Sequence, residues 1–467
     1  MSVGAPDRPI ETLFPDDQEY RQLLGKRARR GRMVQMAFLL ALIMAVLALV
    51  TLLYTIINDS FGLTAMVNEI EPEEVVASLG YDPAVISLSD LSYDELVGVL
   101  VGGIERNVGR RLEREQRFYE DKLVFEGEQK WAEVCSSEEP PAGCDSAPRD
   151  HANVLQLVNE RIVVPDVIAT YEMVPSMLNP EAFEEEISTA FAETPERFPD
   201  YTFDEVQFEW RAWLNLTFLK TPASATPETA GIRTAILGSI WLVAITVAFA
   251  VPVGVGAAVY LEEFARPSRL NDFIQTNINN LAGVPSIIYG MLGLAIMVRV
   301  LEPITSGSIF GDYSDNGRTV LSAGLTLGLL TLPVVIISSQ EALKAVPNSL
   351  RQAGMAVGAT KLQTVRSQVL PLAMPGILTG TILAVARAIG ETAPLILVGA
   401  ASFITADPTG PFSKFTALPI QIFQWTALPQ QEWQNLAAAA SLALLIMLLI
   451  LNAGAVILRN RYSRRAS

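Results

Sequence analysis

The stretch that decides the fold is residues 341–376, EALKAVPNSLRQAGMAVGATKLQTVRSQVLPLAMPG. Asn348 or Ser349 is a suitable N-cap for a short helix that runs to about Val357, because a side-chain oxygen there can accept a bond from a free backbone N–H. Gly358 follows at once and can adopt the left-handed conformation that commonly ends a helix. The pattern therefore predicts a short helix that ends at a glycine corner.

Beyond this glycine the pattern predicts a second helix. Thr360 supplies its N-cap oxygen, and we expect the helix to stop before Pro371, which lacks an N–H. Two short helices joined at a glycine would form a compact projection with basic and small residues on its surface. Such a projection could enter a groove on a partner protein. An ordinary loop helix between two membrane spans has the same pattern, and spacing alone does not decide between them.

This stretch lies between two of six apolar segments, each about 20 residues or longer and therefore able to cross a bilayer. The first follows a basic cluster; we interpret it as a retained anchor, because it starts late, is long and lacks a small-residue cleavage site. Four of the others contain prolines, which membrane helices tolerate. The segments are 33–57, 234–261, 281–301, 320–339, 372–401 and 435–458.

The positive-inside rule orients these segments. The basic N-terminus, the loop 340–371 and the basic tail fall on the cytoplasmic side, whereas 58–230, 302–318 and 402–434 fall outside. The sequence thus predicts a multi-pass membrane protein with both termini in the cytoplasm. Its expected parts are a cytoplasmic segment 1–32, the anchor 33–57, an outer region 58–230, a five-helix core 231–460 and a basic cytoplasmic tail 461–467.

Charge is divided unevenly along the 467 residues. The formal net charge is −16, although half the residues are hydrophobic. Residues 59–230 hold 35 acidic and 12 basic side chains, a net of −23, and the remainder is +7. This division excludes a nucleic-acid binder that relies on overall charge, and the apolar content excludes wholesale disorder.

The acidic region alternates apolar and charged stretches and should fold as an α-rich or α+β domain. Its charged segments 103–123 and 181–192 read as helices. The tripeptide at 226–228, Thr-Pro-Glu, reads as another helix start, with an N-cap oxygen followed by proline.

Cysteine and histidine usage limits the chemistry of the chain. Cys135 and Cys144 are the two cysteines, and they suit either a disulfide-closed loop outside the cytoplasm or two reduced thiols. His151 is the single histidine, so a histidine-based metal site or a serine triad is not expected. We predict no metal site, no bound cofactor and no catalytic residue.

The loop at 340–371 resembles the cytoplasmic coupling loop of bacterial ABC-importer permeases, which reads Glu-Ala-Ala, three residues, Gly, then nine residues before an apolar-x-Leu-Pro ending. Gln352 replaces the usual Glu, and Gln368 stands where an aliphatic residue is typical. The residues that fall on the pattern, with their neighbours, are Gln352, Ala353, Gly354, Gly358, Ala359, Leu370 and Pro371.

Further motifs narrow this resemblance to the phosphate-specific permeases of the PstA type, over about 226–460. The N-terminal anchor and acidic region are similar to the extra region that some members carry. The motifs are Tyr-Leu-Glu-Glu at 260–263, Val-Pro-Ser-Ile-Ile-Tyr-Gly at 284–290, Gly-Ala-Thr-Lys at 358–361, Met-Pro-Gly at 374–376 and Gly-Glu-Thr-Ala-Pro-Leu at 390–395.

The resemblance implies an all-α polytopic protein of the bacterial inner membrane, with residues 58–230 in the periplasm. Its type I ABC-importer core would form half of a phosphate pathway. Its expected partners are a second homologous permease, two cytoplasmic ATPase subunits, a periplasmic phosphate-binding protein and the lipid bilayer, with no nucleic acid. The chain itself would not be an enzyme. ATP would be hydrolysed by the ATPase partner, because this sequence has no Gly-x-x-x-x-Gly-Lys-[Ser/Thr] P-loop.

Two charges lie within the fifth apolar segment. Arg387 and Glu391 are four residues apart, so they share one helix face and can pair. Pro394 cannot donate to the Gly390 carbonyl, which predicts a helix break beside the pair. Charges at this depth need partners. The pair is either a phosphate-pathway site, with Arg387 offering a forked donor set, or a staple to the partner subunit; the resemblance favours the pathway.

Other functions remain open at the level of sequence. The same architecture could carry another oxyanion, such as molybdate, sulfate or phosphonate, since substrate choice rests largely on the binding protein. A membrane sensor with an outer ligand domain would suit the anchor and acidic region. Five further spans and the coupling-type loop argue against a sensor. Intramembrane hydrolysis would need metal ligands or paired aspartates that the sequence does not offer.

Overall fold

The computed structural model describes residues 17–68, 70–106, 151–163, 165–194, 202–310, 317–400, 404 and 406–466. The predictions for Cys135 and Cys144, and for most of the helix at 103–123, lie outside these residues. The chain divides into two compact units, Met1–Ile57 and Asn58–Ser467. The first unit contains most of α1 (Asp17–Ser60), one continuous helix that includes the predicted anchor.

The acidic region, residues 58–230, contains a three-stranded antiparallel sheet, and we call it the acidic module. The strand order is β2-β1-β3, with β1 (Phe61–Asn68) central, β2 (Pro165–Thr170) on one side and β3 (Gln207–Ala212) on the other. Thr64 faces Thr170 across one pair and Glu209 across the other. The sheet joins strands that lie far apart in the sequence, so the module has the α+β form.

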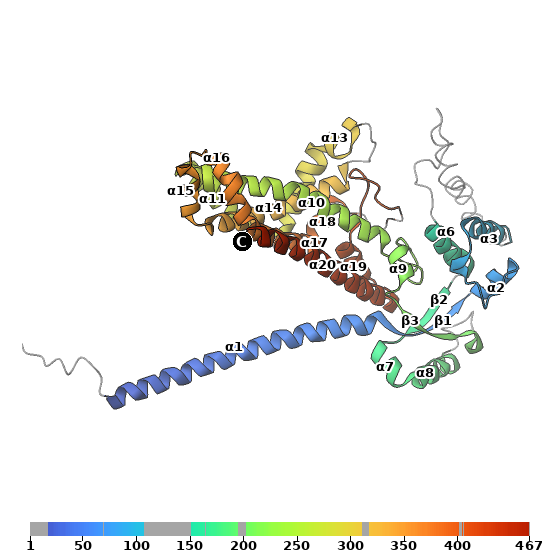
Figure 1. Cartoon of the computed structure of the whole chain (residues 1–467). Coiled ribbons are helices and arrows are strands. Elements are labelled where there is room, and N and C mark those ends of the chain that lie inside the picture. Colours follow the sequence, from blue (N-terminus) through green and yellow to red (C-terminus); the bar gives the residue numbers. More distant parts are fainter. Residues whose placement is uncertain are drawn as a thin grey trace, which may run out of the picture. The chain divides into compact units, whose positions relative to one another are not determined.

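Helices flank this sheet (Figure 1). One group shares a hydrophobic core that includes Val76, Leu96, Leu100, Val154 and Val158. The prediction of a helix at 181–192 is confirmed by α8. The helices of the module are α2 (Pro72–Ser78), η2 (Leu88–Asp90), α3 (Tyr93–Arg106), α6 (His151–Val158), η4 (Asn159–Val163), α7 (Met173–Leu178), α8 (Pro180–Glu193), η6 (Phe203–Glu205) and α9 (Leu216–Lys220).

The predicted helix start at Thr226 is wrong. Residues 222–231 form a folded turn that is closed by a bond from the Gly231 N–H to the Pro222 carbonyl (2.8 Å), and the Thr226 hydroxyl bonds the Thr229 hydroxyl. A Cβ at Gly231 would lie 2.1 Å from the Thr221 Oγ1. This close packing of the turn overrides the local helix signal.

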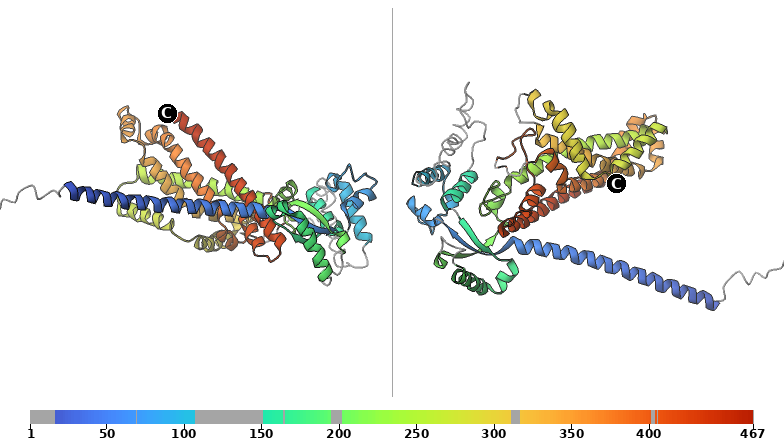
Figure 2. Two further views of the ribbon diagram at one scale, coloured as in Figure 1. Left: turned by 90° about the horizontal axis from the view of Figure 1, so that it is seen from below. Right: turned by 180° about the vertical axis from the view of Figure 1, so that it is seen from behind.

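We call residues 231–467 the helical core, and four long helices dominate the part of it that the structure describes. Helix α14 (Val320–Lys344) packs against α10 (Arg233–Val259) and α17 (Leu370–Gly390), and α20 (Gln431–Ala466) packs against α17 and α19 (Leu418–Thr426) (Figure 2).

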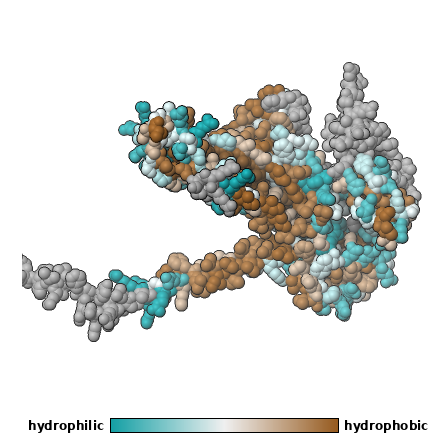
Figure 3. Space-filling view, in the orientation of Figure 1, coloured by the Kyte–Doolittle hydropathy of each residue, from teal (hydrophilic) through white to brown (hydrophobic). Residues whose placement is uncertain are grey.

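Small residues let these helices approach closely. A Cβ at Gly328 would lie 2.6 Å from the Phe249 Cδ1, and one at Gly254 would lie 2.7 Å from the Val335 Cγ1. Helix contacts of this kind are typical of membrane proteins, in which packing and not water exclusion holds helices together. Much of the visible surface of the helical core is correspondingly apolar (Figure 3).

Five described helices are long and apolar enough to span a membrane, or six if one bent pair counts as a span. The five are Arg29–Ser60, Arg233–Phe264, Val320–Lys344, Lys361–Gly390 and Gln431–Tyr462. The short connecting helices are η7 (Tyr260–Phe264), α13 (Glu302–Thr305) and η9 (Ser308–Phe310).

The bent pair replaces the continuous third segment that we predicted at 281–301. Helix α11 (Arg269–Leu281) meets α12 (Ser286–Gly293), which continues as η8 (Leu294–Val300), at 106°. The bend is at Pro285, whose ψ is 139° and therefore extended. Proline restricts the residue before it and removes one helical donor, so the chain turns there.

The fifth predicted segment is broken as well. Helix α17 ends at Gly390, Glu391 is extended with ψ 115°, and α18 (Ala393–Val398) begins with Pro394 in its first turn.

The predicted helix stop before Pro371 is wrong. Helix α16 (Lys361–Thr364) continues through η11 (Val365–Val369) into α17 without a break. The π-helical turn of η11 ends two residues before Pro371 and changes the hydrogen-bond pattern that the proline would otherwise interrupt.

Candidate functional site

The first candidate site is the projection at residues 345–364, which we call the knob. Helix α15 (Asn348–Ala356) ends at Gly358, whose φ is +83°. The Gly358 N–H donates to the Met355 carbonyl (3.0 Å) and the Ala359 N–H to the Gly354 carbonyl (3.2 Å). These two bonds form a Schellman ending, which satisfies carbonyls that a helix terminus leaves free.

The N-cap that we predicted for the first helix of the knob is wrong, whereas the N-cap predicted for the second helix is confirmed. Pro347, and neither Asn348 nor Ser349, occupies the N-cap of α15, and no side chain caps that end. Thr360 does cap α16: its hydroxyl accepts from the Gln363 N–H (3.3 Å), and the Gln363 Oε1 accepts from the Thr360 N–H (2.8 Å). This reciprocal pair is a capping box.

Gly354 sets the distance between the two helices of the knob. A Cβ there would lie 2.7 Å from the Thr364 Cγ2 and 2.8 Å from its Oγ1, below the separation that two non-bonded atoms tolerate. Thr364 is buried. Glycine at this position therefore permits the close contact between α15 and the start of the next span.

Sequence reasoning missed the residue pair that fastens the knob to the helical core. Arg351 Nη2 lies 2.7 Å from Glu263 Oε1, and Arg351 Nε donates to the same oxygen at 3.0 Å. Arg351 also donates to the Leu343 carbonyl (2.9 Å) and the Val346 carbonyl (2.7 Å) at the end of α14. One guanidinium thus joins η7, α14 and α15.

The burial of this pair makes the junction strong. The Glu263 side chain is 5% exposed and the Arg351 side chain 18% exposed. A buried carboxylate left without its partner is costly, so the two side chains hold their elements together. Their separation by 88 positions in the sequence explains why no local pattern revealed the pair.

The opposite face of the knob is open. Gln352 and Ala353 are exposed, as are Met355 at 52%, Val357 at 84% and Leu362 at 64%. Beyond the knob, Leu370 is half-buried and Pro371 is exposed. Exposed apolar side chains on a projection otherwise rich in polar groups are typical of a surface that docks a partner.

The second candidate site is the pair in the fifth span. Arg387 Nε lies 3.3 Å from Glu391 Oε1, at the point where α17 ends. The Arg387 side chain is 49% exposed and that of Glu391 18%. In the part of the chain that the structure describes, Glu391 is the one carboxylate within ion-pair distance of Arg387. Much of the guanidinium is therefore free to meet a further group.

The helices that follow the breaks in the third and fifth spans touch each other. A Cβ at Gly290 of α12 would lie 2.6 Å from the Pro394 Cα of α18, so the two backbones are in contact. Broken helices of transporters commonly place their free backbone groups around a central site. The structure thus brings Arg387, Glu391 and Pro394 to the region where two interrupted spans meet.

No group of three or more His, Cys, Asp or Glu side chains among the described residues could hold a metal ion.

Comparison with known proteins agrees with this architecture. The family described as "Binding-protein-dependent transport system inner membrane component" matches residues 250–467. The chain is 34% identical over 237 residues to the phosphate transport system permease protein PstA of Yersinia pestis, which covers 50% of this chain and 75% of that protein. It is 30% identical over 256 residues to the probable ABC transporter permease protein YqgI of Bacillus subtilis, covering 52% of this chain and 82% of that protein.

The chain belongs to the PstA-type family of ABC transporter permeases. It is therefore a membrane-spanning permease of an ABC importer, as the motifs at 260–263, 284–290 and 390–395 indicated. Among solved structures it is similar to the MetNI methionine ABC transporter, with 20% identity and a TM-score of 0.38 over 50% of this chain and 97% of that chain. The acidic module of the permease lies outside the residues that the family model matches.

Proposed function

We propose that this permease is one of the two membrane subunits of an ATP-driven phosphate importer. The observation that carries the proposal is the Arg387–Glu391 ion pair at the break of a span, in a chain whose relatives include phosphate permeases. A guanidinium offers several N–H donors in a fixed fork, the geometry that suits a phosphate oxyanion. Arg387 would bind the passing anion, and Glu391 would hold Arg387 between passages.

The knob would couple this pathway to a cytoplasmic ATPase. Its exposed face, with Gln352, Ala353, Met355 and Val357, is the docking surface. Arg351 fixes the knob to α14 and to η7, which continues α10. Movement of a docked ATPase would therefore be passed to two spans at once. In this arrangement the chain hydrolyses no ATP, and the ATPase partner does.

The orientation and the partners follow from the same proposal. The basic loop 340–371 and both termini lie in the cytoplasm, and the acidic module lies in the periplasm. A second, homologous permease covers the exposed side of Arg387, two ATPase subunits bind the knobs, and a periplasmic phosphate-binding protein delivers the anion.

The test is phosphate uptake by the assembled transporter in vesicles. Arg387→Gln keeps the size of the side chain and removes its charge, so we expect transport to be abolished while the ATPase subunits still assemble. Glu391→Gln should slow transport, because Arg387 would then retain the anion. Arg299→Gln, an exposed arginine in η8, is the matched control and should transport normally. Normal uptake by an assembled Arg387→Gln variant would overturn the pathway role.

A further inference from the structure

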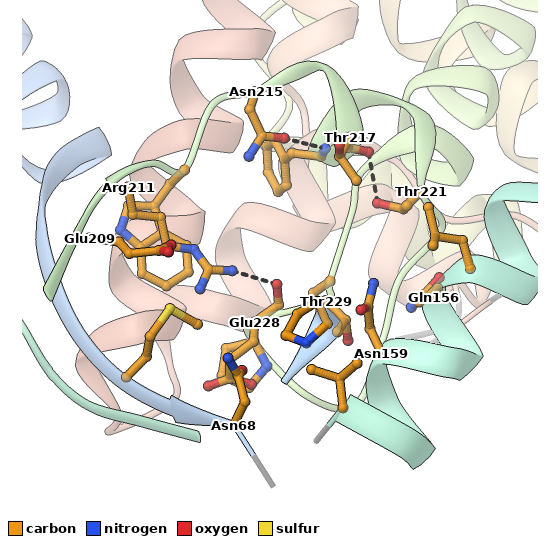
Figure 4. A pocket seen from close by; sticks show the side chains of 18 of the residues that line it. Asn68, Gln156, Asn159, Glu209, Arg211, Asn215, Thr217, Thr221, Glu228 and Thr229 are labelled. Carbon is orange, nitrogen blue, oxygen red and sulfur yellow. Dashed lines mark hydrogen bonds between the residues drawn. The ribbon is translucent and has the colours of Figure 1, made fainter. Parts of the chain in front are cut away.

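A cavity of about 520 Å³ lies where the acidic module adjoins the start of the helical core. Its walls come from β1, β3, α6, η4, α9 and the turn at 222–231 (Figure 4), and Leu436 of α20 also contributes to the lining. The volume falls in the range of small-molecule sites. The lining is mixed, with amides, hydroxyls and carboxylates beside apolar side chains.

Arg211 of β3 is the basic residue of this lining. Its guanidinium stacks over the Trp213 ring at 4.4 Å, and its Nη2 donates to the backbone carbonyl of Glu228. Burial lowers the pKa of Arg211, and the charges of Glu228 and Glu209 oppose that change.

No carboxylate of the described residues lies within ion-pair distance of this guanidinium. Arg211 is therefore a half-buried cation that an indole and a carbonyl hold in place, with the charges of Glu228 and Glu209 nearby but without an ion pair in the described part of the chain. A guanidinium carries five N–H donors, so Arg211 has further donors at the cavity wall with which to bind an oxyanion.

The carboxyl group of Glu228 forms no ion pair among the described residues. Burial raises the pKa of Glu228 to about 7, and the nearby charges of Glu432 and Asp166 add to the increase, whereas a hydrogen bond from its own backbone N–H and the charge of Arg211 oppose it. Glu209 lies on the other side of Arg211, at the exposed rim of the cavity (Figure 4). A cationic group beside Glu228 would relieve its repulsion with Glu432 and Asp166.

A third carboxylate of the lining is already satisfied. Glu71 accepts from the Gln207 side-chain amide (2.9 Å) and from the Asn68 side-chain amide (3.2 Å). Glu71 therefore already has two hydrogen-bond donors, and Glu73, which also lines the cavity, is exposed. The lining thus offers one guanidinium to an oxyanion and carboxylates to a cation.

We propose that this cavity binds a small zwitterion, whose oxyanion group meets Arg211 and whose ammonium group lies beside Glu228. Phosphoethanolamine has this chemistry, either free in solution as its glycerol ester or as the head group of a membrane lipid. The site is separate from the Arg387 pathway and does not depend on the proposed transport function.

The test is calorimetric titration of the full chain, held in phosphatidylcholine nanodiscs, with glycerophosphoethanolamine. We expect binding, and at least about tenfold weaker binding of inorganic phosphate or ethanolamine, each of which supplies one of the two charges. Arg211→Gln should weaken binding of the zwitterion roughly 10- to 100-fold, the usual effect of losing charged hydrogen bonds. Glu228→Gln should weaken the zwitterion and leave inorganic phosphate unchanged or tighter.

Two controls keep the test decisive. Lys220→Gln removes an exposed positive charge of α9 outside the cavity lining and should not change binding. Arg211→Lys keeps the charge, so a weakened but measurable affinity is expected if Arg211→Gln does not fold.

Replacing the nanodisc lipid by phosphatidylethanolamine distinguishes a lipid head group from a water-soluble molecule as the source of the phosphoethanolamine. Weaker binding of glycerophosphoethanolamine in these nanodiscs would mean that the lipid competes for the site, which supports a lipid head group. Unchanged binding of glycerophosphoethanolamine supports a water-soluble zwitterion.

Three results would overturn the proposal. They are no binding of glycerophosphoethanolamine at concentrations up to about 10 mM, equal affinity for inorganic phosphate, and unchanged affinity in the folded Arg211→Gln variant.

Discussion

Replacing Arg351 by methionine is the sharpest perturbation of the link between the knob and the helical core. Methionine keeps much of the apolar stem and removes the guanidinium, so Glu263 stays buried without its partner, and the carbonyls of Leu343 and Val346 lose a donor. Breaking a buried ion pair costs roughly 3–5 kcal/mol. Because the Arg351 side chain retains 18% exposure, we take the lower value, about 3 kcal/mol. That cost corresponds to a roughly 100-fold increase in local opening.

Hydrogen exchange of α15, measured by mass spectrometry on the nanodisc-held chain, reports this opening directly. We expect exchange in α15 to rise by up to about 100-fold in Arg351→Met, with little change in the outer half of α14. The double variant Glu263→Gln, Arg351→Met should recover much of the protection, because it leaves no unpaired buried charge. Arg366→Met, at an exposed arginine of η11, is the matched control.

Either of two results would refute the reasoning. One is exchange of α15 in Arg351→Met that stays within about threefold of the wild type, since the pair would then contribute under 1 kcal/mol. The other is a double variant no better protected than the single one, since the cost would then not come from the unpaired Glu263.

Three further predictions concern local geometry and charge. Gly354→Ala forces a Cβ against Thr364 and should destabilise the knob by about 1–3 kcal/mol, seen as faster α15 exchange; unchanged exchange would show that the contact relaxes freely. Gly358→Ala places a side chain at φ +83° and should cost about 1 kcal/mol by the same measurement, whereas a stabilising effect would contradict the left-handed assignment. Because the pKa of Glu228 is raised from 4.5 to about 7, its protonated form is favoured in the folded state. The free energy of unfolding should therefore fall by about 3 kcal/mol as pH rises from about 4.5 to about 7. Glu228→Gln should remove this part of the pH dependence, measured by unfolding at a series of pH values. An unchanged pH dependence in that variant would contradict the raised pKa of Glu228.

Features that depend on local chemistry could be predicted from the sequence. The apolar segments were identified because backbone groups in a membrane must be satisfied within one helix, which requires a long apolar run. The corner of the knob could be predicted because glycine readily adopts the left-handed conformation that ends a helix, as at Gly358. Threonine is a preferred N-cap, which indicated that a second helix begins after Thr360. Family motifs then supplied the permease assignment.

Features that depend on distant contacts could not be predicted. The pair Arg351–Glu263 and the sheet of the acidic module each join residues far apart in the chain, and nothing in either local pattern indicates the partner. The turn at 222–231 was misread for a related reason: its packing against Thr221 overrides a good N-cap signal. The bend at Pro285 does have a local indication in the sequence, because a proline after Gly-Val favours a bend over a continuous span.

The central claim, phosphate import, is tested most directly by one measurement. The permease, reconstituted in liposomes with its permease partner, ATPase and binding protein, is supplied with ATP and labelled phosphate. We predict ATP-dependent accumulation of phosphate that excess unlabelled phosphate suppresses and that sulfate, molybdate or phosphonate does not. Accumulation of one of those other oxyanions in preference to phosphate, by an assembled and ATP-hydrolysing complex, would contradict the account.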